Sequence, residues 1–242
     1  MLWTDEGVVL AVRRHGESGA IVSVFTARHG RYAGLVRGGF GRRARPVYQQ
    51  GNILHVTWRA RLDEQLGALT GELKIPLAAR LMADPARLAG LAAACALLET
   101  TLPERDPHPD LYATLGAFLE QLVEGQAWLE SYVRFELALL AELGFGLDLG
   151  RCAVTGTSED LVYVSPKSGR AVSRSGAGQY AERLLALPAF LLGRAPADAD
   201  QLNAGLRLTG AFLRRHLFDA SERAVPTARD RLLARLARTT EP

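Results

Sequence analysis

Short alternating runs of apolar and polar residues fill the first eighty or so positions of the chain and predict β-strands. The pairs His29-Gly30 and Gly51-Asn52 are turn signals between runs, because glycine takes the positive φ that a tight hairpin needs. The expected strands cover residues 7–12, 20–26, 31–37, 53–58 and 67–74. Short strands at this density are typical of a small closed or nearly closed barrel.

From Pro76 the apolar spacing changes to threes and fours, which predicts helices. Asp84-Pro85 favours a helix start, because aspartate caps the first turn and proline suits it. Residues 147–178 lose this period and predict a short hairpin instead. The expected helices cover 84–100, 109–124, 127–143, a region near 179, 199–218 and 226–238; the expected hairpin pairs 161–164 with 170–173, and the last four residues are expected to fray.

Charge is distributed unevenly along the chain. The net charge is only +3, yet residues 1–80 hold twelve basic residues against six acidic ones. From Ser18 to Leu62 there are eight arginines and no carboxylate. Cations without acidic neighbours need an external partner, and arginine among aromatic residues on a small β surface suits nucleic acid. The simpler alternative, an arginine-rich solvated surface, does not explain why acids are missing from this stretch.

The candidate nucleic-acid contacts are these arginines and the aromatic residues beside them. Residues 38–46 are expected to form a flexible basic loop that follows a nucleic-acid backbone. Phe25 and Trp58 lie inside apolar strands and are expected to be buried, whereas three other aromatic residues are better placed to stack on bases. The candidates are Arg28, Arg31, Tyr32, Arg37, Phe40, Arg42, Arg43, Arg45, Tyr48, Arg59 and Arg61.

Several function classes are disfavoured. No lysine precedes residue 74, so the glycine-rich segment 38–41 does not match a nucleotide-binding P-loop. The histidines are scattered without metal-ligand spacing, and two cysteines cannot make a four-thiolate site. No nucleophile elbow is present, and carboxylate pairs such as Asp63-Glu64 fit solvated turns. We therefore expect neither an enzyme nor a cofactor.

Cysteine usage and the N-terminus bear on the compartment. Cys95 and Cys152 are too few for a disulfide framework, which favours a reducing environment. Asp5 and Glu6 stand where a signal peptide carries basic residues, and the longest apolar-rich run, 88–98, is too short to span a bilayer. We expect a cytoplasmic protein without a membrane partner.

Segments along nearly the whole chain resemble, in their order and spacing, the bacterial DNA repair and recombination-mediator family RecO. They are Asp5–Leu10, Arg13–Glu17, Val24–Thr26, His29–Arg31, Val36–Gly38, Leu102–Pro109, Arg134–Glu136 with Leu140, Leu143-Gly144, and Leu147–Leu149 before Cys152. The resemblance implies an α+β multidomain protein. An N-terminal OB-fold β-barrel, residues 1–78, is followed by an α-helical domain, 79–242, with a small degenerate zinc-finger-like insert at 148–178.

The resemblance also implies a non-enzymatic role in the RecF pathway of DNA repair. Proteins of this kind bind single- and double-stranded DNA, anneal complementary strands, pair with RecR, and contact the acidic C-terminal tail of single-stranded DNA-binding protein. They help to load RecA, which implies association with the nucleoid during repair. Arg134 lies in a matching tract and is a candidate contact for that acidic tail. Its alternative is a helix-surface salt bridge with Glu130, four residues earlier.

Many relatives carry four zinc-binding cysteines in the insert. Cys152 matches the first, but the other positions fall near Thr155, Val172 and Ser175. The resemblance therefore implies that the zinc site has been lost, and that the segment is held by its hairpin and by packing.

Two other interpretations of the sequence stay open. One is an RNA-binding OB-fold protein of translation or RNA processing, since OB barrels serve either polymer. The other is an enzyme whose active site uses dispersed residues.

Overall fold

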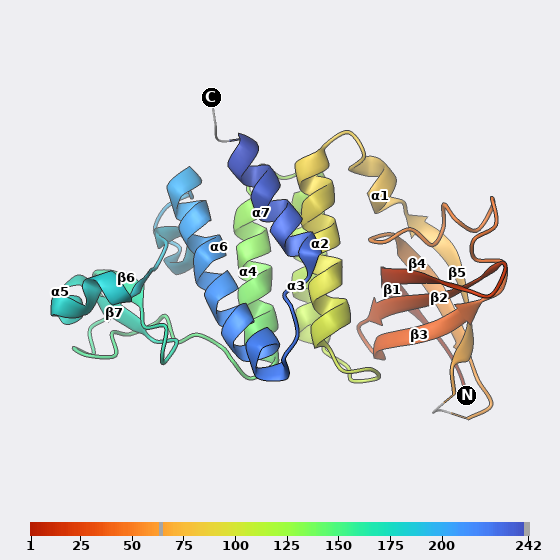
Figure 1. Ribbon diagram of the computed structural model, residues 1–242, viewed down its shortest axis with the longest axis horizontal. Coiled ribbons are helices and arrows are strands. Elements are labelled where there is room, and N and C mark those ends of the chain that lie inside the picture. Colours follow the sequence, from red (N-terminus) through yellow and green to blue (C-terminus); the bar gives the residue numbers. More distant parts are fainter. Residues whose placement is uncertain (63–64, 240–242) are drawn as a thin grey trace. The chain divides into compact units, whose positions relative to one another are not determined.

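The computed structural model describes residues 1–62 and 65–239 (Figure 1). Asp63 and Glu64, expected in a solvated turn, and residues 240–242, expected to fray, lie outside the described residues. The chain forms two compact units, one of Met1–Gly125 with Pro226–Pro242 and one of Gln126–Val225. The barrel strands end at Ile75 and the first helix begins at Leu77, close to the boundary at residue 78 that the sequence suggests, and the first unit contains both strands and helices.

Five strands close into a barrel in the order β1-β2-β3-β5-β4, as the strand pattern predicts. They are β1 (Leu2–His15), β2 (Gly19–Thr26), β3 (Gly30–Val36), β4 (Ile53–Arg59) and β5 (Gly67–Ile75). The long β1 pairs with β4 through its first half and with β2 through its second. β3 and β5 run parallel and meet at Gly34–Gly67 and Leu35–Ala68. This barrel, followed by helices, agrees with the expected N-terminal OB-fold.

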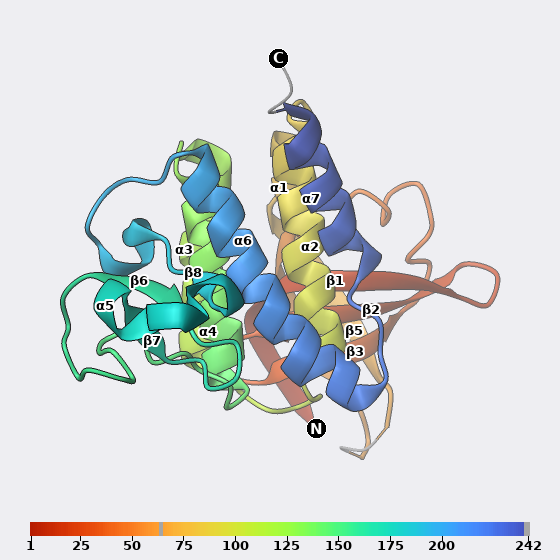
Figure 2. The same cartoon turned by 60° about the vertical axis from the view of Figure 1, so that its left-hand side comes forward.

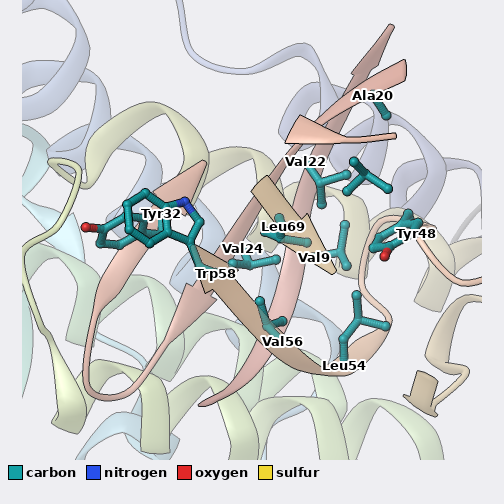
Figure 3. Close-up of a cluster of buried hydrophobic side chains, with 11 residues drawn as sticks. Val9, Ala20, Val22, Val24, Tyr32, Tyr48, Leu54, Val56, Trp58 and Leu69 are labelled. Atoms are coloured by element: carbon teal, nitrogen blue, oxygen red, sulfur yellow. The ribbon is translucent and has the colours of Figure 1, made fainter. Parts of the chain in front are cut away.

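Side chains that alternate along the strands fill the barrel (Figure 3). They include Val9, Val22, Val24, Leu54, Val56 and Leu69. The indole of Trp58 is fully buried, and its N–H donates to the carbonyl of Ala33 at 3.1 Å. A Cβ added at Gly67 would lie 2.3 Å from the Trp58 ring, so only glycine fits there. Tyr32 and Trp58 lie at one end of this core and Tyr48 lies at the other.

The first half of β3 pairs with β2 on one side and is covered on the other by residues 102–109, here called the edge tract. Arg31 and Glu104 form a parallel bridge, and the N–H of Arg105 donates to the carbonyl of Arg31 at 2.8 Å. The approach is closest at Gly30 (φ +67°), where a Cβ would lie 1.9 Å from the carbonyl oxygen of Asp106.

The first unit also contains α1 (Leu77–Arg80), α2 (Pro85–Thr101), α3 (Pro109–Glu124) and α7 (Thr227–Thr239). The predicted helix start is confirmed, since Asp84 Oδ1 accepts the N–H groups of Ala86 and Arg87 at 3.0 and 3.1 Å. The Arg87 guanidinium in turn donates to the carbonyls of Leu122 and Gly125, at 2.6 and 2.9 Å, which caps the end of α3. The C-terminal α7 packs along α2 in both ribbon views (Figures 1 and 2).

The second unit pairs α4 (Trp128–Glu142) with α6 (Ala199–Leu213) and carries a small sheet in the order β7-β6-β8. Its other elements are β6 (Leu161–Val164), β7 (Ala171–Ser173), α5 (Arg174–Ala177), η1 (Gly178–Arg183), β8 (Leu185–Ala186), η2 (Ala189–Leu192), η3 (Arg214–Phe218) and η4 (Asp219–Ser221). The predicted hairpin is confirmed by the pairing of β6 with β7. The helix expected near residue 179 is a short 3₁₀ segment, because the positive φ of Gly178 (+48°) interrupts an α-helix. No helix in the described parts of the chain is long and apolar enough to cross a membrane.

We predict that Gly67→Ala lowers the free energy of unfolding by about 1–3 kcal/mol, because the added methyl overlaps the Trp58 ring. Urea denaturation followed by circular dichroism measures this change.

Gly116→Ala is the matched control, since nothing lies within 4 Å of a Cβ at this position on α3. Alanine has the higher helix propensity, so this substitution should stabilise by roughly 0.5–1 kcal/mol. Equal stability of Gly67→Ala and the natural chain would contradict the tight contact.

Candidate nucleic-acid interface

The segment between β3 and β4, residues 37–52, is anchored on the barrel. Within it, residues 41–48 make two turns of backbone hydrogen bonds that are 2.9 to 3.1 Å long. The side-chain amide of the buried Asn52 donates to the carbonyls of Pro46 and Val47 at 3.0 Å each. These turns and this buried amide give the segment regular local structure, and the flexibility expected of residues 38–46 stays a prediction.

Four arginines on this segment, Arg37, Arg42, Arg43 and Arg45, are here called the cationic loop. All four are exposed. Within residues 1–62 and 65–239, none of them forms an ion pair with a carboxylate. Ala44, which lies between Arg43 and Arg45 in the sequence, and Val47, two residues after Arg45, pack against the barrel core. The turns therefore bury their apolar residues and leave a group of cations in solvent.

The β1–β2 hairpin lies beside the cationic loop, since the N–H of Phe40 donates to the carbonyl of Ser18 at 3.2 Å. A groove of about 540 Å³ lies between residues 11–13 of β1 and the loop residues Phe40 and Arg45. Phe40 is 37 % exposed. It is therefore the one aromatic residue among the three stacking candidates that is accessible to a base.

Two of the predicted contacts already have acidic partners. The Arg31 guanidinium, 15 % exposed, lies 3.7 Å from the Glu99 carboxylate and 3.2 Å from that of Glu104. Arg28 lies 3.1 Å from the carboxylate of Asp5. The expectation that these arginines lack internal partners is wrong, because the fold brings in acids from outside the acid-free stretch. Arg31 thereby joins the barrel to α2 and the edge tract.

Tyr32 and Tyr48 are 6 % and 8 % exposed and belong to the barrel core. The expectation that they are accessible to bases is wrong. Tyr32 occupies an inward position in the alternation of β3, and Tyr48 ends the second turn of the loop. The Tyr48 hydroxyl accepts the N–H of Gly71 at 2.8 Å, and burial raises the pKa of this tyrosine. The predicted burial of Phe25 and Trp58 is confirmed.

Arg59 and Arg61 lie where β4 ends, with Arg59 opposite Leu2 of β1. Both are exposed, and neither is ion-paired within the part of the chain that the structure describes. The N–H of Ala60, between them, donates to the carbonyl of Met1 at 3.1 Å, which places this end of β4 beside the N-terminus. The eight arginines of the acid-free stretch thus fall into two sets. Arg28 and Arg31 are ion-paired, whereas the cationic loop and the pair Arg59 and Arg61 form two exposed groups.

Arg134, the candidate partner contact, lies on the exposed side of α4. Its guanidinium donates to the carbonyl of Phe190 and lies 5.7 Å from the centre of that ring. The alternative of a salt bridge with Glu130 is wrong, because Glu130 Oε1 instead accepts the N–H of Ala197 at 3.0 Å.

The sulfur of the buried Cys152 is the centre of a polar cluster in the second unit. It accepts hydrogen bonds from the N–H and hydroxyl of Ser173, at 3.2 and 3.3 Å, and from the N–H of Thr155 at 3.4 Å. Burial raises the pKa of the Cys152 thiol, but these hydrogen bonds outweigh burial and lower the pKa to about 6.

This cluster does not suit zinc, because it offers a single thiolate. The residues that face the sulfur from β7 and α5 are Ser173 and Gly176, where a Cβ would lie 2.9 Å away. Both are next in sequence to Val172 and Ser175, the positions near which the resemblance places the later pair of cysteines. No group of three metal-ligating side chains forms among the described residues. Absence of stoichiometric zinc stays a prediction, which elemental analysis of the purified protein tests.

Sequence reasoning missed residues outside the acid-free stretch. Arg13 and Arg14 are exposed on the β1–β2 hairpin beside the cationic loop, and Arg13 lies 3.0 Å from Glu99. Trp3 and His29 stack against each other at the other end of the barrel core. Trp3 packs against the core because it pairs with the inward-facing Trp58 across β1 and β4, a pairing that appears only in the folded chain.

Comparison with known proteins extends this description. A family model described as "Recombination protein O N terminal" matches residues 1–75, and one described as "Recombination protein O C terminal" matches residues 82–223. A Cereibacter sphaeroides protein named "DNA repair protein RecO" is 54% identical over 241 residues, covering 98% of this chain and 99% of its own. Proteins of the same name from Rhodospirillum rubrum and Beijerinckia indica are 51% and 50% identical, and each match covers at least 96% of both chains.

We predict that Ser173→Ala raises the pKa of the Cys152 thiol, because the hydroxyl no longer stabilises the thiolate. A pH titration of thiolate ultraviolet absorbance in a Cys95→Ser background measures it. The natural pKa of about 6 lies below the ordinary 9.0, so the thiolate contributes stability above pH 9 that is lost as pH falls through 6.

Ser175→Ala is the control, since the Ser175 hydroxyl contacts that of Ser173 and not the sulfur. An unchanged titration midpoint in Ser173→Ala would remove the hydroxyl as the cause of the lowered pKa.

Proposed function

Because the chain belongs to the RecO family of DNA repair proteins, we propose that it acts in repair by binding DNA through the cationic loop. Family membership supports a role in DNA repair and recombination. The observation that carries the binding proposal is a group of four exposed arginines without an acidic partner in residues 1–62 and 65–239. Arginine is suited to phosphate, because its planar guanidinium donates charge-assisted hydrogen bonds in pairs.

Contacts to phosphate do not depend on base sequence. Each arginine that meets a phosphate releases a condensed counterion, so binding weakens as salt rises. The same loop can therefore hold single- or double-stranded DNA. Phe40 and the adjacent groove offer a contact to an unpaired base. Annealing follows from charge neutralisation, since two strands brought to one cationic surface repel each other less.

The partner proposals follow from the family. We propose that the protein pairs with RecR and contacts the acidic tail of single-stranded DNA-binding protein. Together these contacts promote the loading of RecA at the nucleoid. The role of Arg134 as a contact for the acidic tail stays a prediction, since its guanidinium also holds the carbonyl of Phe190. The proposed role is binding and exchange of strands, with no catalytic step.

An RNA-binding function is the alternative, because an OB barrel with exposed arginines does not by itself select DNA. Competition between single-stranded DNA and RNA of matched sequence separates the two. A clear preference for RNA would overturn the DNA proposal.

We predict that the triple substitution Arg42→Ala, Arg43→Ala and Arg45→Ala weakens binding to single-stranded DNA and flattens its salt dependence. Loss of about 0.7 from the slope of log affinity against log salt is expected for each phosphate contact, or about 2 for all three. Fluorescence anisotropy across a salt series measures the slope.

Arg151→Ala, Arg183→Ala and Arg207→Ala form the matched control, because these arginines are exposed in the second unit and remove the same net charge. The control should keep the natural slope. An equal loss in both variants would indicate attraction by overall charge and would remove the cationic loop from the interface.

A further inference from the structure

Three rings form a continuous stack that begins inside the barrel. The Trp58 and Trp3 rings lie 6.0 Å apart between centres, and those of Trp3 and His29 lie 4.2 Å apart. The interplanar angle is 14° at each step, so the rings are nearly parallel. Tyr32 packs edge-on against both tryptophans, with centres 5.1 and 4.9 Å away. The stack is therefore held laterally as well as along its length.

The two ends of the stack differ in exposure. Trp58 is fully buried, whereas His29 lies half-buried in the turn between β2 and β3. The backbone N–H of His29 donates to Thr26 Oγ1 at 3.1 Å, which holds the turn in place. Trp3 is the only aromatic residue in the described part of the chain that stacks with His29. The next ring position in the series is thus not filled by an aromatic side chain of these residues.

The indole N–H of Trp3 is an independent indication of a missing partner. It is buried and has no hydrogen-bond acceptor among the described residues. A buried donor without an acceptor costs free energy, and such groups in native proteins are uncommon. An acceptor supplied by a ligand or by water would relieve that cost.

Three arginines neighbour the residues of the stack, one in space and two in sequence. The Arg105 guanidinium lies 5.2 Å from the centre of the Tyr32 ring. The backbone of Arg105 has a φ of +64°, which is uncommon for residues other than glycine. Arg28 neighbours His29 in the turn and holds the Asp5 carboxylate, which would otherwise repel phosphate. Arg59 follows Trp58 directly on β4 and is exposed. Aromatic faces flanked by arginine are the groups that bind unpaired nucleotides.

We propose that an unpaired nucleobase stacks on His29 and extends the three-ring series, with its phosphates near Arg28, Arg59 and Arg105. This proposal rests on the nucleic-acid binding proposed above and adds a second site. The cationic loop leads into Tyr48, which lies at the opposite end of the barrel core from Tyr32 and Trp58 (Figure 3). Two sites at separate ends of one barrel can hold two strands.

The chemistry of the stack favours a base over a charged ligand. Burial lowers the pKa of His29 from its ordinary 6.5, while Asp5 raises it and Arg28 lowers it. The imidazole is thus neutral near pH 7, and its ring offers a flat, uncharged face. Every nucleobase has such a face, so the site should accept any base.

The test combines a substitution at His29 with removal of one base from the DNA strand. Single-stranded DNA carrying the fluorescent base aminopurine is compared with the same strand lacking that base, for the natural chain and for His29→Ala. The natural chain should quench the fluorophore and bind the intact strand roughly 5- to 100-fold more tightly than the abasic one. His29→Ala should lose most of that preference and most of the quenching, and any remainder reports the contact of a base with Phe40. Matched RNA strands test whether the sugar matters.

His29→Phe is the rescue variant, because phenylalanine restores a ring without a titrating group, and it should regain the preference for the intact strand. The slope of log affinity against log salt should be the same in all His29 variants as in the natural chain, since no charge is removed at neutral pH. Natural quenching and natural preference in His29→Ala would overturn the stacking site while leaving the cationic loop intact. Absence of any DNA binding by the natural chain would instead overturn the proposed function.

Discussion

The barrel closes where the indole of Trp58 packs against glycine. Cβ atoms at Gly34 and Gly67 would lie 3.1 and 2.3 Å from that ring, and these two residues form half of the short parallel contact between β3 and β5. A larger side chain at Gly67 would force the strands apart. The same Trp58 ring supports Trp3 at one end of the core, and the core that it helps to fill carries Tyr48 and its loop at the other. Both proposed nucleic-acid sites therefore depend on it.

The strands and helices were predictable because their signals are local. Alternation, turn glycines and the Asp84 cap act within a few residues, and the barrel and α2 follow from them. The neutralisation of Arg31 was not predictable, because Glu99 and Glu104 reach it only after the chain has folded. Tyr32 is a different case. Its inward position follows from the period of β3, but the neighbouring arginines favoured an assignment of Tyr32 to the solvent face of the strand.

The difference between local signals and contacts that form only on folding also explains why the two units were not predicted. Sequence patterns mark the change from strands to helices, but they do not reveal which helices pack together. α7 returns from the end of the chain to lie along α2, so the first unit is completed last during synthesis. The polar cluster around Cys152 in the second unit is another feature that depends on the folded chain. There, hydrogen bonds from Ser173 and Thr155 to the Cys152 sulfur tie together residues that lie about twenty positions apart.

The edge tract has a consequence for the protein in crowded solution. The first half of β3 would otherwise present free backbone donors and acceptors, which is the template on which separate chains add to one another as intermolecular sheet. The bridge between Arg31 and Glu104 occupies that template, and Gly30 lets the tract approach closely. A proline-rich, kinked segment makes a poor strand for further addition. The same residues that join the barrel to its helices thereby guard it against aggregation.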